Sequence, residues 1–212
     1  MIVLTLDQRG SRRGEDLVPA LLDLVDRHAT LRAFQRTAGD EVQAVFEDAG
    51  AAVGAALDAA GTGQWNVGLG VGAVRLPLPA ETRAGAGPAF EAARDAVERS
   101  KRTQARLALS AATQQEAREP DTTLGRAERL EAELALIALS LRRRSTEQWE
   151  ACRLRERGWG QARIAQALGV SQQAVSARLN AAWFEECQAL TRAAIGALAH
   201  LADNVQNPGS NA

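Results

Sequence analysis

The chain has 212 residues, of which 46% are hydrophobic, and a formal net charge of −1. This hydrophobic content excludes a chain that is disordered throughout, and no apolar run approaches the roughly 18 residues that a membrane span needs. Two cysteines, Cys152 and Cys187, are too few for a disulfide framework or a zinc site, so we expect both to be small buried residues of a reduced, cytoplasmic protein.

Residues 1–112 alternate between strand-like and helix-like patterns. Apolar residues that recur at a period of two or of 3.6 separate the two types. In chain order we expect a strand over 2–6, a helix over 15–28, strands over 31–37 and 42–46, a helix over 49–60, a strand over 65–76, a helix from 87 to about 102, and a strand over 106–110. Gly39 and Asp40 supply turn chemistry for a hairpin. This order predicts a ferredoxin-like α/β layer within an α+β fold.

The remaining residues predict helices. Residues 113–144 begin with a polar linker and continue as a long helix, in which Leu130, Leu134, Ile137 and Leu141 recur at spacings of three and four. We expect residues 145–203 to form a helical domain with a long last helix, and residues 204–212 to form a flexible tail. Trp183, Cys187, Leu190 and Leu198 make an apolar stripe, which we expect to pack within the chain.

Residues 161–180 read QARIAQALGVSQQAVSARLN and have the spacing of a helix-turn-helix. Ala165 allows two helices to cross closely, Gly169 permits a left-handed turn, and Val175 belongs to the shared core with Ile164, Leu168, Val170 and Leu179. Ser171 is placed to cap the second helix. A supporting helix over 146–156 contributes Trp149 and Leu154 to the same core.

Polar residues of the second helix predict contact with double-stranded DNA. Gln172, Ser176 and Asn180 recur at i, i+4 and i+8, with Ser171 and Gln173 beside them, which suits reading of base edges in a major groove. Arg163 and Arg178 flank them and suit phosphate contacts. Residues 141–180 also carry eight arginines against three glutamates. A helical hairpin with a polar, solvated outer face is the alternative. Helix-turn-helix proteins commonly read two half-sites, so we expect a homodimer.

A pair of carboxylates in the first domain predicts a second site. Asp7 ends the first strand and Asp40 lies in the hairpin, and these two places are neighbours in a β-α-β-β layer. Two hard oxygen ligands suit Mg²⁺ or Mn²⁺ bound with a triphosphate. Arg9, Arg12 and Arg13 follow Asp7 and suit the phosphates. The alternative is two turn aspartates beside a solvated basic loop.

Four segments resemble class III nucleotidyl cyclases in their order: LTLDQRG, RTAGDEVQAVF, VGLGVGAV and GAGPAFEAARDAVERSKR. Diguanylate cyclases of the GGDEF type share the Gly-Asp-Glu hairpin. The resemblance implies metal binding by Asp7 and Asp40. It matches Arg94 to an arginine that stabilises the transition state, and Arg36 to a lysine that selects purines. Phe90 stands where these enzymes have an asparagine.

The chain as a whole resembles the SatD family, with DQRGSRR, GDE and GPAF as the sharpest stretches. Residues 145–182 resemble the helix-turn-helix of sigma-factor region four. These resemblances imply a DNA-binding regulator whose cyclase-like domain senses a nucleotide or a metal-nucleotide complex. Two alternatives stay open, an active metal-dependent nucleotidyl cyclase or transferase, and a degenerate domain that serves only dimerisation.

Gly68–Ala73 fits the dinucleotide-binding pattern G-x-G-x-x-A, but the pattern must join a strand to a helix, and here it lies within a strand. Glycines on one strand face instead predict close approach of another backbone or a ligand. Lys101 could contact a phosphate, but a lone lysine near a helix C-terminus is the ordinary case. His28 and His200 are isolated in the sequence, so we expect both at the surface.

Overall fold

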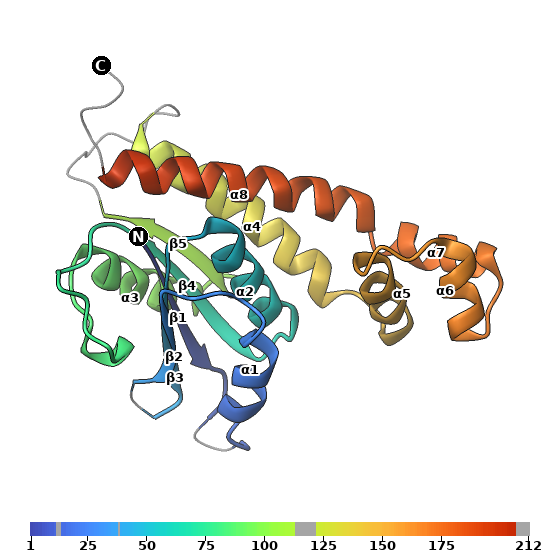
Figure 1. Ribbon diagram of the computed structural model, residues 1–212, viewed down its shortest axis with the longest axis horizontal. Coiled ribbons are helices and arrows are strands. Elements are labelled where there is room, and N and C mark those ends of the chain that lie inside the picture. The colour runs from blue at the N-terminus through green and yellow to red at the C-terminus, as the bar shows by residue number, and fades with distance from the viewer. Residues whose placement is uncertain (12–13, 38, 113–121, 207–212) are drawn as a thin grey trace.

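The computed structural model describes residues 1–11, 14–37, 39–112 and 122–206 (Figure 1). Its first part is a five-stranded sheet with the order β2-β3-β1-β4-β5. The strands are β1 (Ile2–Gln8), β2 (Arg32–Arg36), β3 (Glu41–Phe46), β4 (Trp65–Val71) and β5 (Leu107–Ala111). β1 runs antiparallel to both β3 and β4, and β5 is parallel to β4. The strands β4-β1-β3-β2 have the ferredoxin-like order, which β5 extends. The predicted α+β fold class is confirmed.

Helices cover both faces of this sheet (Figure 1). One face carries α1 (Val18–Val25), α2 (Ala49–Gly61) and α4 (Thr123–Arg142), and α8 (Phe184–Gln206) lies across α4 and α2. The other face carries α3 (Pro88–Ser100), which is preceded by the 3₁₀ turn η1 (Thr82–Ala84). Leu4 of β1, Leu134 of α4 and Leu198 of α8 belong to one buried cluster. We call β1–β5 with α1–α3 the sheet domain.

α3 lies unusually close to β4, and glycines make this possible. Gly68 and Gly70 share the face of β4 that α3 covers, and Gly72, just after the strand, also faces α3. A Cβ atom at Gly70 would lie 2.2 Å from both the carbonyl oxygen of Ala89 and the amide nitrogen of Ala93. The expected close backbone approach is therefore confirmed, and its partner is a helix.

Two elements are shorter than predicted. α1 begins at Val18 rather than at residue 15, because the buried Gln8 side chain holds the preceding loop. Its Nε2 donates to the carbonyl of Glu15 at 2.6 Å, and its Oε1 accepts from the amide of Leu17 at 2.9 Å. β4 ends at Val71 rather than at residue 76, because Val71 is paired with Ile2, the first residue of β1.

The last three helices before α8 form a second, smaller core. They are α5 (Thr146–Glu156), α6 (Gln161–Leu168) and α7 (Gln172–Ala181), and we call them the helix-turn-helix unit. The unit projects from one end of the molecule, beyond α4 and α8 (Figure 1). In the described part of the chain, α4 and α8 are the longest helices, and neither they nor the shorter ones could cross a membrane.

Candidate functional sites

The turn between α6 and α7 has the geometry that the sequence predicts. Gly169 ends α6 in the left-handed region, at φ 66°. Residues with a Cβ atom are disfavoured there, which explains the glycine. Ser171 begins α7, and its hydroxyl oxygen accepts from the amide of Ala174 at 3.1 Å. Ile164, Val175 and Leu179 are buried in the shared core, with Leu168 and Val170 packed against it.

α7 presents several polar side chains to solvent beside this core. Ser171, Gln172, Gln173 and Asn180 are exposed, and Ser176 and Arg178 are half-buried. Val175 and Leu179 are buried in that core, whereas Gln173, Ala177 and Asn180 are exposed on the outer side of the helix and Gln172 is exposed at its N-terminal end. The structure thus places six of the seven predicted DNA contacts on α7 or at its N-cap.

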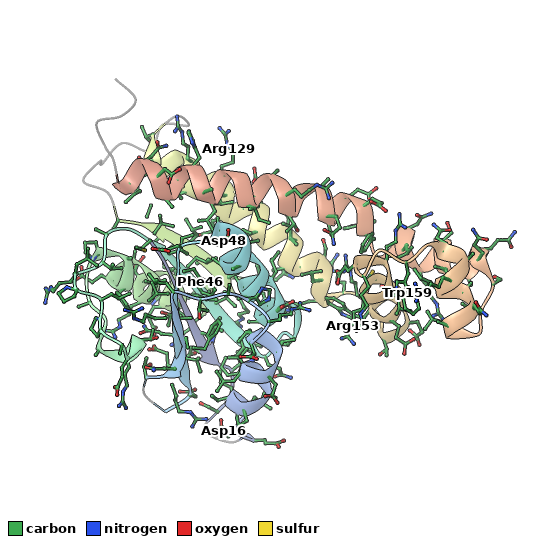
Figure 2. All side chains as sticks on the ribbon, in the orientation of Figure 1. Asp16, Phe46, Asp48, Arg129, Arg153 and Trp159 are labelled. Atoms are coloured by element: carbon green, nitrogen blue, oxygen red, sulfur yellow. The ribbon has the colours of Figure 1, made fainter. Side chains whose placement is uncertain are left out.

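Arg163, the seventh predicted DNA contact, lies on α6 rather than on α7, and its side chain packs against a tryptophan. Its guanidinium carbon is 3.8 Å from the ring centroid of Trp159, in a cation–π contact. Trp159 lies in the loop before α6 (Figure 2). The contact fixes the direction of the arginine, and Arg163 itself stays exposed.

Two other tryptophans depart from the sequence prediction. Trp149 does not enter the core of the helix-turn-helix unit. It faces the sheet domain instead, with its ring 3.5 Å from the position a Cβ atom would take at Gly61 of α2. Trp183 does not join the apolar stripe of α8. It precedes that helix at φ 49° and its exposed fraction is 56%. The stripe continues without it through Cys187, Ala194 and Leu198, which are buried.

Asp7 and Asp40 come to the same end of the sheet, as the topology predicts. The amide of Gln8 donates to the carbonyl of Asp40 at 3.3 Å, which places the end of β1 beside the hairpin. Their carboxylates have different surroundings. Asp7 accepts from Asn66 Nδ2 at 2.9 Å and lies 3.5 Å from Lys101 Nζ. Asp40 lines a hollow of about 310 Å³ with Asp16 and Arg36 among its neighbours.

Lys101 and Asn66 are the residues that sequence reasoning missed at this end. Burial lowers the pKa of Lys101, but its hydrogen bond to Glu98 and the charges of Asp7 and Glu98 outweigh burial, so the pKa is raised overall. The ammonium group is therefore a stable cation beside Asp7. Asn66 is 95% buried, and its Oδ1 has no hydrogen-bond partner. Neither contact is visible in the sequence, because Asn66 and Lys101 are far along the chain from Asp7.

Among the predicted phosphate-binding arginines that the structure describes, none forms an ion pair with Asp7. Arg9 donates to the carbonyl of Gly63 at 2.5 Å, and its pKa is lowered by desolvation and then by the charges of Arg106 and Arg142. Arg36 forms an ion pair with Asp16 at 2.6 Å. Arg94 is exposed on α3. Arg12 and Arg13 lie outside the described residues.

Phe90, which the resemblance to nucleotidyl cyclases matches to an asparagine of those enzymes, is a core residue in this chain. It is buried in the cluster under α3, together with Val3 and Val45. In the described ranges, no group of three or more histidine, cysteine, aspartate or glutamate side chains is arranged to hold a metal ion. A divalent ion at Asp7 or Asp40 would therefore take most of its ligands from phosphate and water.

His28 is not isolated, contrary to expectation. Its Nε2 lies 2.6 Å from Asp58 Oδ2, and its side chain is only 15% exposed. Arg27 pairs with the same carboxylate at 2.6 Å. Asp58 is thirty residues further along the chain, which is why the sequence does not reveal the contact. His200 is exposed, as expected.

Comparison with known proteins adds no relative: no family model, no curated protein and no solved structure matches the chain. The family resemblances therefore stay predictions.

Proposed function

We propose that the chain is a cytoplasmic transcriptional regulator that binds double-stranded DNA through α6 and α7. The observation that carries the proposal is the set of exposed amide side chains on α7, the second helix of a helix-turn-helix. Gln172, Gln173 and Asn180 are exposed, whereas Val175 and Leu179 hold the helix in the shared core. Glutamine and asparagine side chains suit bidentate contacts with adenine in the major groove. Arg163 and Arg178 supply phosphate contacts, and a homodimer would read two half-sites.

The experiment selects binding sites from a random duplex library and then measures affinity for the selected site. We expect Gln172→Ala combined with Asn180→Ala to weaken binding to that site by about 10²–10³-fold, because each bidentate base contact contributes roughly 1–3 kcal/mol of discrimination. Affinity for unrelated duplexes should not change. Arg178→Ala should instead weaken binding to all duplexes and reduce the salt dependence.

The matched control is Gln64→Ala, an exposed glutamine of the sheet domain. It should leave both affinities unchanged. Failure of the library to enrich any duplex, or equal affinities for wild type and the double variant, would show that α7 does not read bases.

A second candidate function is metal-dependent nucleotide sensing at Asp7 and Asp40. It is favoured by the buried Oδ1 of Asn66, which has no hydrogen-bond partner and belongs to a side chain bonded to Asp7. A bound cation would satisfy such an oxygen. The same site underlies the alternative of a nucleotidyl cyclase or transferase, with Arg94 as the group matched to catalysis.

Nucleotide panels with Mg²⁺ or Mn²⁺ test this candidate. If it is right, a nucleotide with metal raises the melting temperature of wild type, and the combined variant Asp7→Ala and Asp40→Ala loses that metal-dependent shift. Product mass then separates sensing from catalysis. A chain that gives neither a metal-dependent shift nor a product would leave the sheet domain as a dimerisation scaffold.

A further inference from the structure

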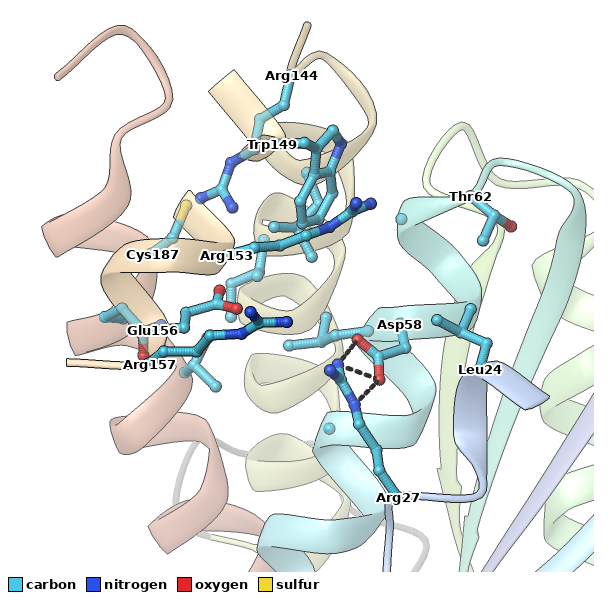
Figure 3. Close-up of a pocket in the computed structure, with 17 residues that line it drawn as sticks. Leu24, Arg27, Asp58, Thr62, Arg144, Trp149, Arg153, Glu156, Arg157 and Cys187 are labelled. Atoms are coloured by element: carbon cyan, nitrogen blue, oxygen red, sulfur yellow. Dashed lines mark hydrogen bonds and ion pairs between the residues drawn. The ribbon is translucent and has the colours of Figure 1, made fainter. Parts of the chain in front are cut away.

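A cavity of about 750 Å³ lies between the sheet domain and the helix-turn-helix unit (Figure 3). Residues of the sheet domain and of the helix-turn-helix unit line its walls. Leu57 and Asp58 of α2 stand on one side, Trp149 and Arg153 of α5 stand on the other, and Ile137 of α4 lies between them. We call this cavity the junction cleft.

The junction cleft is lined by more positive than negative side chains. Arg27, Arg144, Arg153 and Arg157 face two acids, Asp58 and Glu156. Asp58 is already engaged by Arg27 at 2.6 Å, and Figure 3 shows this pair at the edge of the sheet domain. Over the ranges that the structure describes, no carboxylate lies within 4.0 Å of the guanidinium groups of the other three arginines.

Arg144 is the most constrained of these arginines, because it is 91% buried. Its Nε and Nη2 donate to the carbonyl of Ala182 at 3.2 and 3.1 Å, and its guanidinium carbon lies 5.1 Å from the ring centroid of Trp149. A neutral carbonyl, an aromatic ring and the charge of Glu156, which lies beyond ion-pair distance, compensate only part of the desolvation of a full charge. A buried arginine at a cavity wall therefore favours an anion in the cavity.

We propose that the junction cleft binds an organic phosphate of nucleotide size. Guanidinium groups match the geometry of phosphate oxygens and form charge-assisted hydrogen bonds with them. The volume lies within the range of small-molecule sites, and a lone inorganic phosphate would leave most of it unfilled. Leu57, Ile137 and Leu141 add apolar surface for the organic part of the ligand. No residue of this cleft belongs to the site at Asp7 and Asp40.

Occupation of the cleft has a consequence for the helix-turn-helix unit. Arg153 and Arg157 belong to α5 or its C-terminal end, whereas Arg27 and Asp58 belong to the sheet domain. A ligand that contacts both sides favours one orientation of the unit over others. This regulatory step rests on the proposed DNA binding, whereas ligand binding itself does not.

Calorimetric titration of the full chain tests ligand binding, with ATP and pyrophosphate as probes and with EDTA present to exclude metal. We expect ATP to bind more tightly than pyrophosphate. Arg153→Ala combined with Arg157→Ala should weaken ATP binding by about 10²-fold or more, because each charge-assisted hydrogen bond contributes roughly 1.5–3 kcal/mol. Both arginines are exposed, so the variant should fold.

Two controls locate the site. Arg192→Ala removes an exposed arginine of α8 outside the cleft and should not change ATP affinity. The combined variant Asp7→Ala and Asp40→Ala should also bind ATP as wild type does. The proposal is overturned if neither probe binds at millimolar concentration, if the Arg153 and Arg157 variant binds ATP normally, or if the Asp7 and Asp40 variant loses binding. DNA affinity with and without ATP is measured separately, so absence of DNA binding leaves the calorimetric result intact.

Discussion

Gly70→Ala is expected to lower the free energy of unfolding by about 3 kcal/mol or more. The added methyl group would lie 2.2 Å from backbone atoms of Ala89 and Ala93, and neither can move without shifting α3. Overpacking in a core typically costs about 1–3 kcal/mol, and backbone atoms relax less than side-chain ends do. Urea denaturation followed by circular dichroism measures the change.

Gly196→Ala is the matched control for this prediction. Gly196 lies within α8 and has no atom within 4 Å of the added Cβ position. Alanine is the better helix former, so this variant should gain about 0.4–1 kcal/mol. A Gly70→Ala protein as stable as wild type would mean that α3 is not held against β4 as described.

Leu134→Ala is expected to destabilise the chain by about 2–5 kcal/mol. Leu134 is fully buried on α4, in the cluster that joins α4 and α8 to the sheet. Removing a buried leucine loses its transfer free energy and leaves a cavity that the surroundings fill only partly. The same denaturation experiment gives the value.

Leu136→Ala provides the comparison, because it makes the same change two residues away on the same helix. Leu136 is 61% exposed. Its replacement should change the unfolding free energy by no more than about 0.5 kcal/mol. If the two variants lost equal stability, the face of α4 that packs on the sheet would be assigned incorrectly.

Local patterns predicted most of the fold. The short apolar run of β1, the turn at Gly39 and Asp40, and the glycine at position 169 each act through neighbours in the chain, so the sequence contains their signal. The α+β class follows from the order of these elements. The predicted boundaries are wrong where a residue far along the chain determines the end of an element. α1 starts late because Gln8 occupies the loop before it, and β4 ends at Val71, where its pairing with β1 reaches Ile2.

The candidate sites divide in the same way. The face of α7 could be predicted, because residues four apart on one helix share a side. The surroundings of Asp7 could not, because Asn66 and Lys101 reach it from β4 and from the end of α3. The junction cleft could not be predicted either. Trp149 and Leu154 are both apolar residues of α5, so the sequence does not show that Leu154 packs into the helix-turn-helix core whereas Trp149 lines the cleft.

The contact between Arg144 and Ala182 lies where the chain enters and leaves the helix-turn-helix unit. α4 precedes this point, α8 follows it, and both pack on the sheet domain. In architectural terms the unit is an insertion within a discontinuous domain, and its two ends meet. An insertion with adjacent ends adds little loop-closure entropy to the folding of its host. The sheet, α4 and α8 can therefore form one cooperative body that carries the helix-turn-helix unit as an exchangeable part.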